Sequence, residues 1–290
     1  MPVQAKGSLQ SFPTAEGTRR GGRRNGRSSP DGPVWVGVDL GTANVVLTVV
    51  DADGRPRAIR SRAAQVVRDG LVVDFIGAAD LVRELKAEAE AELGLPLTAA
   101  ASGYPPGVPE AEVRAVANVL AAAGLECVCL IDEPTAANLL LKIEHGALID
   151  VGGGTTGVAF VQDGKVVDTA DEATGGTHFT LVIAGALGVS YEEAETLKLD
   201  PARQPDLLPL VRPVMEKVAT ILARHLSNRA VPVIHLVGGA SAFYSMDKVI
   251  EETLGIPVHA APQPLLVTPL GLALAHRTTA EPARARGWVR

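Results

Sequence analysis

Residues 148–167 read LIDVGGGTTGVAFVQDGKVV, and the prediction of the fold turns on how these glycines are interpreted. Gly152, Gly154 and Gly157 fit the G-x-G-x-x-G pattern of dinucleotide-binding proteins. That pattern needs a helix directly after the glycines, because the helix N-terminus faces the pyrophosphate. Here the glycines precede TTGVAFVQDG, which predicts a strand and an Asp-Gly turn. We therefore interpret the stretch as a strand-turn-strand hairpin whose glycines leave backbone N–H groups open to an anion.

A second unit of the same kind occurs earlier in the chain. Asp39-Leu40-Gly41 and the turn residue Gly54 align with Asp150-Val151-Gly152 and Gly164, at separations of 111 and 110 residues. Each unit is followed by further helix and strand patterns. The repeat predicts an α/β fold made of duplicated lobes with a cleft between them.

Apolar periodicity and turn residues predict the elements along the chain. The expected strands cover residues 34–41, 97–104, 125–131, 146–153, 231–239 and 256–260, with hairpins over 43–59 and 155–173. The expected helices cover residues 76–94, 109–124, 134–143, 175–188, 191–200, 205–229, 245–255 and 267–277.

Composition and charge limit the class of protein to which the chain can belong. Of 290 residues, 47% are hydrophobic and only 3% aromatic, as expected for buried sheets of aliphatic residues flanked by helices. No apolar run is long enough for a membrane span and no signal peptide precedes the first strand, so we expect a cytoplasmic protein. Residues 1–33 contain six basic residues and two acidic ones, Glu16 and Asp31, so this segment has a net charge of about +4. Because the formal net charge of the whole chain is −6, the remainder has a net charge of about −10. We expect this segment to be a disordered basic tail that could bind anions, without a specific nucleic-acid site.

Two opposed glycine hairpins could hold a phosphate chain from both sides. Asp39 and Asp150, just before each turn, would then supply carboxylate oxygens for Mg²⁺, which also takes water and phosphate oxygens. The alternative is that both turns are ordinary hairpins with capping aspartates. The occurrence of two copies at matching places favours the phosphate site.

Three segments carry a family resemblance. VGVDLGTANVVLTVVDADG and IDVGGGTTGVAFVQDG resemble the two phosphate motifs of the actin-like ATPase superfamily, which includes actin, DnaK-type chaperones and MreB, and IHLVGGASAF resembles its adenosine motif. The resemblance spans about residues 34–276. It implies two ribonuclease H-like lobes, over residues 34–145 and 146–267, with a nucleotide cleft between them. The first lobe would be completed by a C-terminal helix at about 268–278, before a flexible tail over 279–290.

Within the superfamily, VVRDGLVVDFIGA, DEPTAANLLL and PLLVTPLGLALA resemble the EutJ family of ethanolamine utilization proteins. This resemblance implies an ATP/ADP-binding, slowly hydrolysing, chaperone-like protein. Its partners would be a protein client among ethanolamine-degrading enzymes or bacterial microcompartment components. A nucleotide-dependent assembly or scaffold protein like MreB, FtsA or PilM is the alternative. A small-molecule kinase would need a substrate base and a larger insertion, and neither is evident.

The resemblance also assigns site residues. Asp39 and Asp150 would hold Mg²⁺ through water, and Glu133 would orient or deprotonate the attacking water. An alternative role for Glu133 is a first-turn carboxylate favoured by the helix dipole. Other residues would line the nucleotide: Gly41, Thr42, Asn44, Gly152, Gly153, Gly154, Thr155, Thr156, Gly175, Gly176, Glu195, Lys198, Gly238, Gly239 and Ala240. For Glu195 and Lys198, an i, i+3 ion pair on a solvated helix is the alternative.

The chain departs from the chaperone pattern at two places. Ala242 or Phe243 stands where DnaK-type chaperones have an arginine that packs on the base, and no residue clearly matches their catalytic lysine. We therefore expect slow hydrolysis and a different contact to adenine. No peptide-binding β domain follows the predicted lobes, so a client is expected to bind the ATPase body itself.

Overall fold

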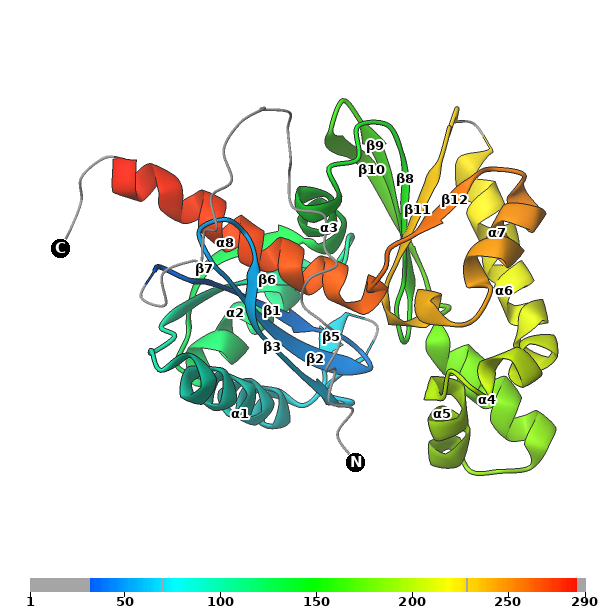
Figure 1. Ribbon diagram of the computed structural model, residues 1–290, viewed down its shortest axis with the longest axis horizontal. Coiled ribbons are helices and arrows are strands. Elements are labelled where there is room, and N and C mark those ends of the chain that lie inside the picture. Colours follow the sequence, from blue (N-terminus) through cyan, green and yellow to red (C-terminus); the bar gives the residue numbers. More distant parts are fainter. Residues whose placement is uncertain (1–31, 69, 228, 286–290) are drawn as a thin grey trace, which may run out of the picture.

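The computed structural model describes residues 32–68, 70–227 and 229–285. Most of the basic tail expected over residues 1–33, and the end of the tail expected over 279–290, lie outside these ranges. The described chain forms two lobes, each built on a five-stranded sheet (Figure 1). None of the described helices is long and apolar enough to cross a membrane.

The first lobe contains a mixed sheet in the order β3-β2-β1-β6-β7. Its first three strands are antiparallel, and β6 and β7 run parallel to β1. The strands are β1 (Trp35–Leu40), β2 (Asn44–Val50), β3 (Pro56–Ala63), β6 (Ala99–Tyr104) and β7 (Glu126–Asp132). The β2–β3 hairpin closes at Asp53-Gly54, as predicted, with a left-handed Gly54 (φ 78°).

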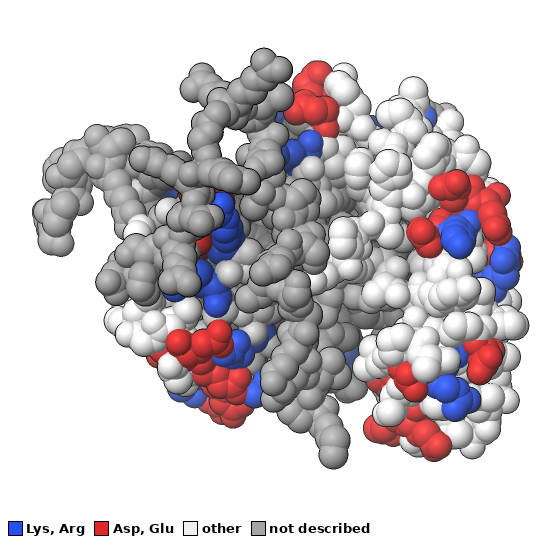
Figure 2. Space-filling view, in the orientation of Figure 1, with Lys and Arg blue, Asp and Glu red and all other residues white. Residues whose placement is uncertain are grey.

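Two helices cover the outer face of this sheet, α1 (Phe75–Leu93) and α2 (Glu110–Ala122). Val36, Val38 and Leu40 of β1 point toward these helices and share one buried cluster with them. Arg60 and Arg62 of β3 form ion pairs with Glu88 and Glu92 of α1. Basic and acidic side chains are accordingly mixed on this part of the surface (Figure 2). A small ribbon of β4 (Val67–Arg68) and β5 (Leu71–Val72), absent from the expected elements, follows β3 and precedes α1 along the chain.

The second lobe repeats the plan with the order β10-β9-β8-β11-β12. Its first three strands in sequence are again antiparallel, and the last two are again parallel to the first. The predicted duplication is therefore confirmed. The strands are β8 (Gly146–Val151), β9 (Thr156–Gln162), β10 (Lys165–Glu172), β11 (Ile234–Val237) and β12 (Val258–Ala260). The helices are α4 (Gly176–Leu187), α5 (Tyr191–Leu199), α6 (Gln204–Leu226) and α7 (Met246–Leu254).

Two further helices, α3 (Glu133–Leu141) and α8 (Val267–Ala285), lie between the sheets (Figure 1). Although α8 follows the second lobe in sequence, it packs on the first sheet, where a Cβ on Gly37 of β1 would lie 2.5 Å from the Ala273 nitrogen. α8 also crosses α3 so closely that a Cβ on Gly271 would lie 1.9 Å from the Ala136 carbonyl oxygen. Ala137 of α3 and Val267 of α8 share a buried cluster with Leu148 and Ala159 of the second sheet, so the two helices join both lobes.

The C-terminal helix is longer than expected. We expected it to end at about residue 278 and a flexible tail to begin at 279, but α8 continues to Ala285. Ala280 packs against the buried cluster around Trp35 and Leu270, so the apolar stripe continues past the expected end. The Thr278 and Thr279 hydroxyls donate to carbonyl oxygens three residues earlier, which adds local contacts to this turn.

The α3–α8 crossing gives a test of the fold. Gly271→Ala places a methyl group against the Ala136 carbonyl oxygen, so we expect it to lower the free energy of unfolding by about 1–3 kcal/mol or more. Gly185→Ala, in α4 with nothing within 4 Å of the added methyl, is the matched control and is expected to stabilise by up to about 1 kcal/mol. Urea unfolding measures both, and equal effects of the two substitutions would contradict the close crossing.

Candidate functional site

A cleft of about 1320 Å³ lies between the lobes. It is lined by the ends of β1, β2 and β8, by the start of α3 and by the β11–α8 region. All predicted site residues line it except Thr156 and Gly175. The Thr156 hydroxyl is buried and donates to the Thr174 carbonyl oxygen at 2.7 Å. Gly175 lies beneath the cleft surface, where a Cβ would lie 2.6 Å from the Gly152 carbonyl oxygen.

The two glycine turns both line the cleft and contact each other there. A Cβ on Gly153 would lie 2.7 Å from the Cβ of Ala43, and one on Gly154 would lie 3.1 Å from Cγ2 of Thr42. The turns can approach this closely only because the second one carries no side chains. The start of α4 packs against the same turn, since the Gly176 and Thr177 N–H groups donate to the Gly152 and Gly153 carbonyl oxygens.

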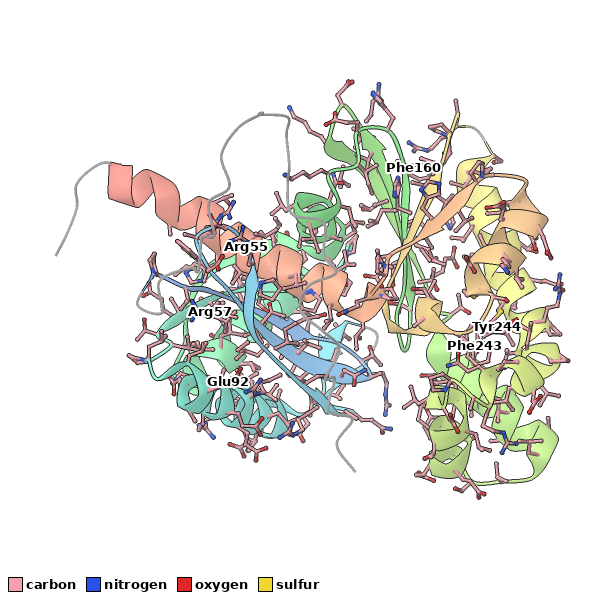
Figure 3. The ribbon with its side chains drawn as sticks, in the orientation of Figure 1. Arg55, Arg57, Glu92, Phe160, Phe243 and Tyr244 are labelled. Carbon is pink, nitrogen blue, oxygen red and sulfur yellow. The ribbon has the colours of Figure 1, made fainter. Side chains whose placement is uncertain are left out.

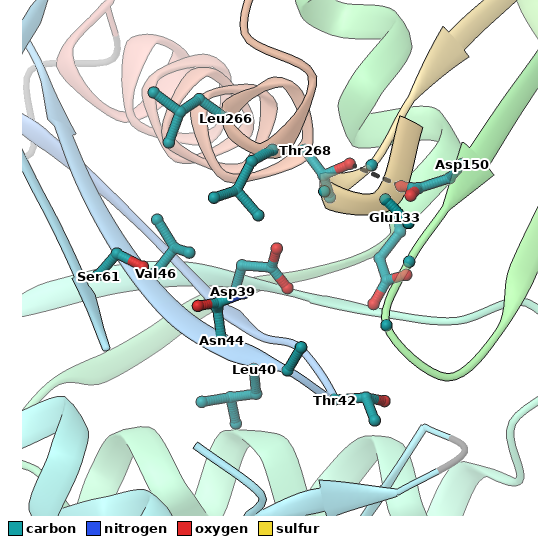
Figure 4. Close-up of a pocket in the computed structure, with 18 of the residues that line it drawn as sticks. Asp39, Leu40, Thr42, Asn44, Val46, Ser61, Glu133, Asp150, Leu266 and Thr268 are labelled. Atoms are coloured by element: carbon teal, nitrogen blue, oxygen red, sulfur yellow. Dashed lines mark hydrogen bonds between the residues drawn. The ribbon is translucent and has the colours of Figure 1, made fainter. Parts of the chain in front are cut away.

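Strand alternation directs both predicted aspartates into the cleft. In β1, Val38 and Leu40 face α1 and α2, so Asp39 points to the opposite side, toward α8. In β8, Ile149 and Val151 face the helices of the second lobe, so Asp150 also points between the lobes. Figure 4 shows both carboxyl groups at the cleft, with the Thr268 hydroxyl of α8 donating to Asp150 Oδ2 at 3.2 Å.

Glu133 begins α3 at the cleft. Asp132, the residue before it, caps the helix by accepting the Thr135 N–H at 2.9 Å, so Glu133 is free of the capping role. Its side chain passes Gly103 of β6, where a Cβ would lie 3.1 Å from Glu133 Cγ. Glu133 therefore occupies the first turn of α3, where the helix dipole favours a carboxylate, and it also lines the same cleft as Asp39 and Asp150 (Figure 4).

The three carboxyl groups share an enclosed and acidic environment, although each keeps partial exposure to the cleft. Burial raises the pKa of Asp39 from 3.8 to about 7, with a further contribution from Asp150. Burial likewise raises the pKa of Asp150 to about 6, against the lowering effect of the Thr268 hydrogen bond. The pKa of Glu133 is raised well above 4.5 by burial first, then by Asp39, Asp150, Asp171 and Asp132.

The E-x-x-K pair of α5 belongs to the cleft wall. Lys198 Nζ lies 2.7 Å from Glu195 Oε2 and donates to the Thr180 hydroxyl and the Gly176 carbonyl oxygen of α4. The Lys198 side chain is only 12% exposed, so this is not an ion pair on a solvated helix surface. The network fixes both residues against the start of α4.

The same end of the cleft contains the predicted adenosine motif. Gly238, with φ 89°, and the short helix η1 (Gly239–Ala242) form its floor, and Ala240 lies close to Gly176. Phe243 does not face the cleft: it is 5% exposed, packs edge-on to Phe179 at 5.8 Å and lies among the second-lobe helices (Figure 3). Leu265, in the short helix η2 (Pro264–Leu266), lines this end of the cleft instead.

Asp171 of β10 is a cleft residue that the sequence analysis missed. It lines the same cavity as Asp39, Glu133 and Asp150, and it contributes to the raised pKa values of Glu133 and Asp150. Asp171 pairs with Gly157, which in turn pairs with Asp150. Counting back from the Asp163-Gly164 turn would pair Asp171 with Thr156 instead, because the β9–β10 register shifts between Val166 and Asp168, so the hairpin pattern alone did not reveal this position.

Comparisons with known proteins settle the family. Ethanolamine utilization protein EutJ of Salmonella typhimurium is 42% identical over 255 residues, which cover 88% of this chain and 90% of that protein. The crystal structure of EutJ from Carboxydothermus hydrogenoformans superposes with a TM-score of 0.81 at 48% identity, covering 83% of this chain and 89% of the other. The chain belongs to the EutJ family.

More distant matches place the EutJ family member in the actin-like ATPase superfamily. The MreB/Mbl protein family matches residues 54–199, and the cell division protein FtsA family matches residues 147–275. MreB5 of Spiroplasma citri bound to ADP shares the fold, with a TM-score of 0.69 at 19% identity over 88% of this chain and 99% of that one. The chaperone protein HscA homolog of an Azoarcus species is 30% identical over 73% of the chain, which spans about a third (35%) of the HscA homolog.

The raised pKa values predict how stability changes with pH in this member of the EutJ family. In the absence of divalent cations, the folded state holds more protons than the unfolded state between pH 3.8 and about 7. The contribution of these groups to the free energy of unfolding therefore falls as pH rises through that window. Asp39→Asn removes part of the effect, so its stability relative to the unaltered protein should rise from pH 5 to pH 7.5 in EDTA.

Urea unfolding at the two pH values measures this difference. Glu84→Gln, on the exposed side of α1, is the control and should keep a constant difference from the unaltered protein. A constant difference for Asp39→Asn would contradict the raised pKa of this carboxyl group.

Proposed function

We propose that the protein binds Mg-ATP in the interlobe cleft, hydrolyses it slowly and acts on a protein client in ethanolamine utilization. The observation that carries the proposal is the arrangement of two opposed glycine turns, each preceded by an aspartate that faces the same cleft. The names of the EutJ relatives support the process, and the chaperone name of the HscA homolog supports action on a protein. Ethanolamine-degrading enzymes and microcompartment components are the proposed clients.

The glycine turns suit the phosphate end of a nucleotide. Gly153 and Gly154 bring main chain rather than side chains to the surface opposite Thr42, so backbone N–H groups can approach phosphate oxygens. The MreB5 structures contain ADP or AMPPNP, which supports a nucleotide as the ligand of this fold. At the other end, Lys198 and Glu195 are proposed to contact the ribose, and Gly238, Gly239 and Ala240 to form the floor for the base.

The carboxyl groups fit a hard cation. Asp39 and Asp150 present oxygen donors from opposite lobes, and their mutual repulsion decreases when a cation lies between them. No group of three or more ligating side chains converges on one point within the described residues, so we propose that these aspartates act through water. Mg²⁺, when bound, neutralises charge on the phosphoryl group that is transferred.

Glu133 is proposed to hold and deprotonate the attacking water. Its side chain lines the same cleft as the two aspartates, and burial raises its pKa above the ordinary value. A raised pKa brings a general base closer to neutral pH and strengthens its attraction for a proton. Lys198 is the one lysine among the described residues that line the cleft, and no residue clearly matches the catalytic lysine of DnaK-type chaperones. Both observations are consistent with the slow hydrolysis that we propose.

Nucleotide-dependent assembly is the alternative function. The matches to the MreB/Mbl and FtsA families, and a TM-score of 0.70 with a structure of the PilM-PilN pilus biogenesis complex, favour it as the second candidate. ATP-dependent sedimentation of the purified protein would support assembly, whereas a protein that stays monomeric with ATP would support the client-directed switch.

The first test is nucleotide binding. Mg-ATP at about a hundred times its Kd is expected to stabilise the folded protein by about 2.7 kcal/mol, seen as a rise in Tm. Asp150→Ala removes one aspartate and its bond from Thr268, and should abolish the rise. A cooperative thermal unfolding transition of the ligand-free variant is the control for folding. If Mg-ATP left the Tm of the unaltered protein unchanged, the proposal would be refuted.

The second test separates hydrolysis from binding. Glu133→Gln keeps the shape of the side chain but cannot accept a proton, so phosphate release in single turnover should fall by about a hundredfold or more. The Mg-ATP-induced rise in Tm should remain. Asp132→Asn, which keeps the helix cap, is the matched control and should hydrolyse ATP at close to the normal rate. Unchanged hydrolysis in Glu133→Gln would rule out its role as the base.

A further inference from the structure

The first turn of α8 contains a threonine whose hydroxyl bonds outside its own helix. Thr268 Oγ1 donates to Asp150 Oδ2 at 3.2 Å, although the two residues are 118 positions apart in the sequence (Figure 4). Threonine hydroxyls in helices commonly bond to nearby backbone carbonyl oxygens. The Thr278 and Thr279 hydroxyls of α8 do so, each with a carbonyl oxygen three residues earlier. The Thr268 hydroxyl is directed to a carboxyl group of the cleft instead.

The first lobe fixes the place of Thr268. The carbonyl oxygen of the next residue, Pro269, accepts the hydroxyl of Thr48 in β2 at 2.7 Å, and Thr48 is completely buried. A Cβ on Gly37 of β1 would lie 2.5 Å from the same carbonyl oxygen, so this turn of α8 lies directly on the first sheet. Thr268 itself is buried. Its hydroxyl is therefore held by the first lobe while it bonds to a carboxyl group of the second.

The second lobe confines the other oxygen of the same carboxyl group. A Cβ on Gly238 would lie 2.2 Å from Asp150 Oδ1, so this oxygen packs where any other residue would place a side chain. The Gly238 N–H donates to the Pro264 carbonyl oxygen at 3.1 Å, which fixes the glycine beside the start of α8. With Oδ2 bonded to Thr268 and Oδ1 packed on Gly238, the Asp150 carboxyl group has a defined orientation at the cleft.

A defined orientation matters for a group that binds a cation. A carboxylate that is already oriented loses less rotational freedom on binding than one that turns freely. Hydrogen-bond partners that orient a ligating group typically contribute about 10- to 100-fold to the affinity for the metal. The hydroxyl of Thr268 is a partner of this kind for Asp150.

We propose that Thr268 is a positioning residue that holds the Asp150 carboxylate in the orientation that receives the cation of bound Mg-ATP. The inference rests on the proposed function and deepens it, because it gives the C-terminal helix a part in nucleotide binding. α8 packs on the first sheet and Asp150 belongs to the second, so the orientation of this carboxylate depends on how the two lobes sit against each other.

The test compares nucleotide binding with and without metal. Thr268→Val keeps the shape of the side chain and removes the hydroxyl. The Mg²⁺ concentration at the midpoint of the AMPPNP-induced rise in Tm should increase by about tenfold. In EDTA, the affinity for AMPPNP should stay normal, because the glycine turns are unaltered. Titration of Mn²⁺ followed by electron paramagnetic resonance should show the same weakening for the metal directly.

Three further variants complete the experiment. Thr268→Ser keeps the hydroxyl and should return the Mg²⁺ midpoint close to the normal value. Thr268→Ala removes the hydroxyl with a smaller side chain and should match Thr268→Val, which separates the loss of the bond from a packing defect. Thr278→Val removes the same group from the same helix, where the hydroxyl bonds only to its own backbone, and should keep the normal midpoint.

The bond can also be measured in the ligand-free protein. If Thr268 and Asp150 interact, the effects of Thr268→Val and Asp150→Asn on the free energy of unfolding in urea should not be additive. Additive effects would contradict the bond. The inference would be overturned if Thr268→Val had the Mg²⁺ midpoint of Thr278→Val, if it weakened AMPPNP binding equally in EDTA, or if Thr268→Ser failed to restore the midpoint. Failure of the unaltered protein to bind Mg-AMPPNP would instead refute the proposed function.

Discussion

The contact on which the rest of the structure depends is the crossing of α3 and α8, where Gly271 meets the Ala136 carbonyl oxygen without a side chain between them. α8 packs on the first sheet through Gly37, while Thr268 in its first turn donates to Asp150 of the second sheet. α3, which it crosses, begins with Glu133. One close helix contact therefore sets the spacing of the two sheets and, with it, the positions of side chains from both lobes that meet in the cleft.

The cleft contains carboxyl groups that do not stabilise the folded state when they are ionised. Burial raises the pKa values of Asp39, Glu133 and Asp150, and nearby carboxylates raise them further, which means that the folded state disfavours their ionised forms. Groups perturbed in this way concentrate at functional sites, because stability is given up there for chemistry. The surface ion pairs of Arg60 and Arg62 with α1 show the contrast: there, each acidic side chain has a basic neighbour.

The sequence predicted the duplicated sheets and most of the cleft because these depend on local patterns. Strand alternation directed Asp39 and Asp150 to one side, and the Asp-Gly turns fixed both hairpins. Asp171 was missed because its place in the cleft depends on pairing across β9 and on the register shift between Val166 and Asp168, which a motif that follows one strand does not contain. The burial of Phe243 depends on the distant ring of Phe179, and the extension of α8 to Ala285 depends on packing against Trp35, so neither could be inferred from neighbouring residues.

Under the proposed function, the two-lobe arrangement makes nucleotide binding and lobe geometry interdependent. Asp39 belongs to the first sheet and Asp150 to the second, so a cation that contacts both through water binds most tightly at one separation of the lobes. Any client that binds better to a different separation must then weaken nucleotide binding by the same factor by which nucleotide weakens client binding. The helices that join the lobes, α3 and α8, are the elements that have to move for this coupling to operate. A client surface that includes either helix would therefore sense the state of the nucleotide most directly.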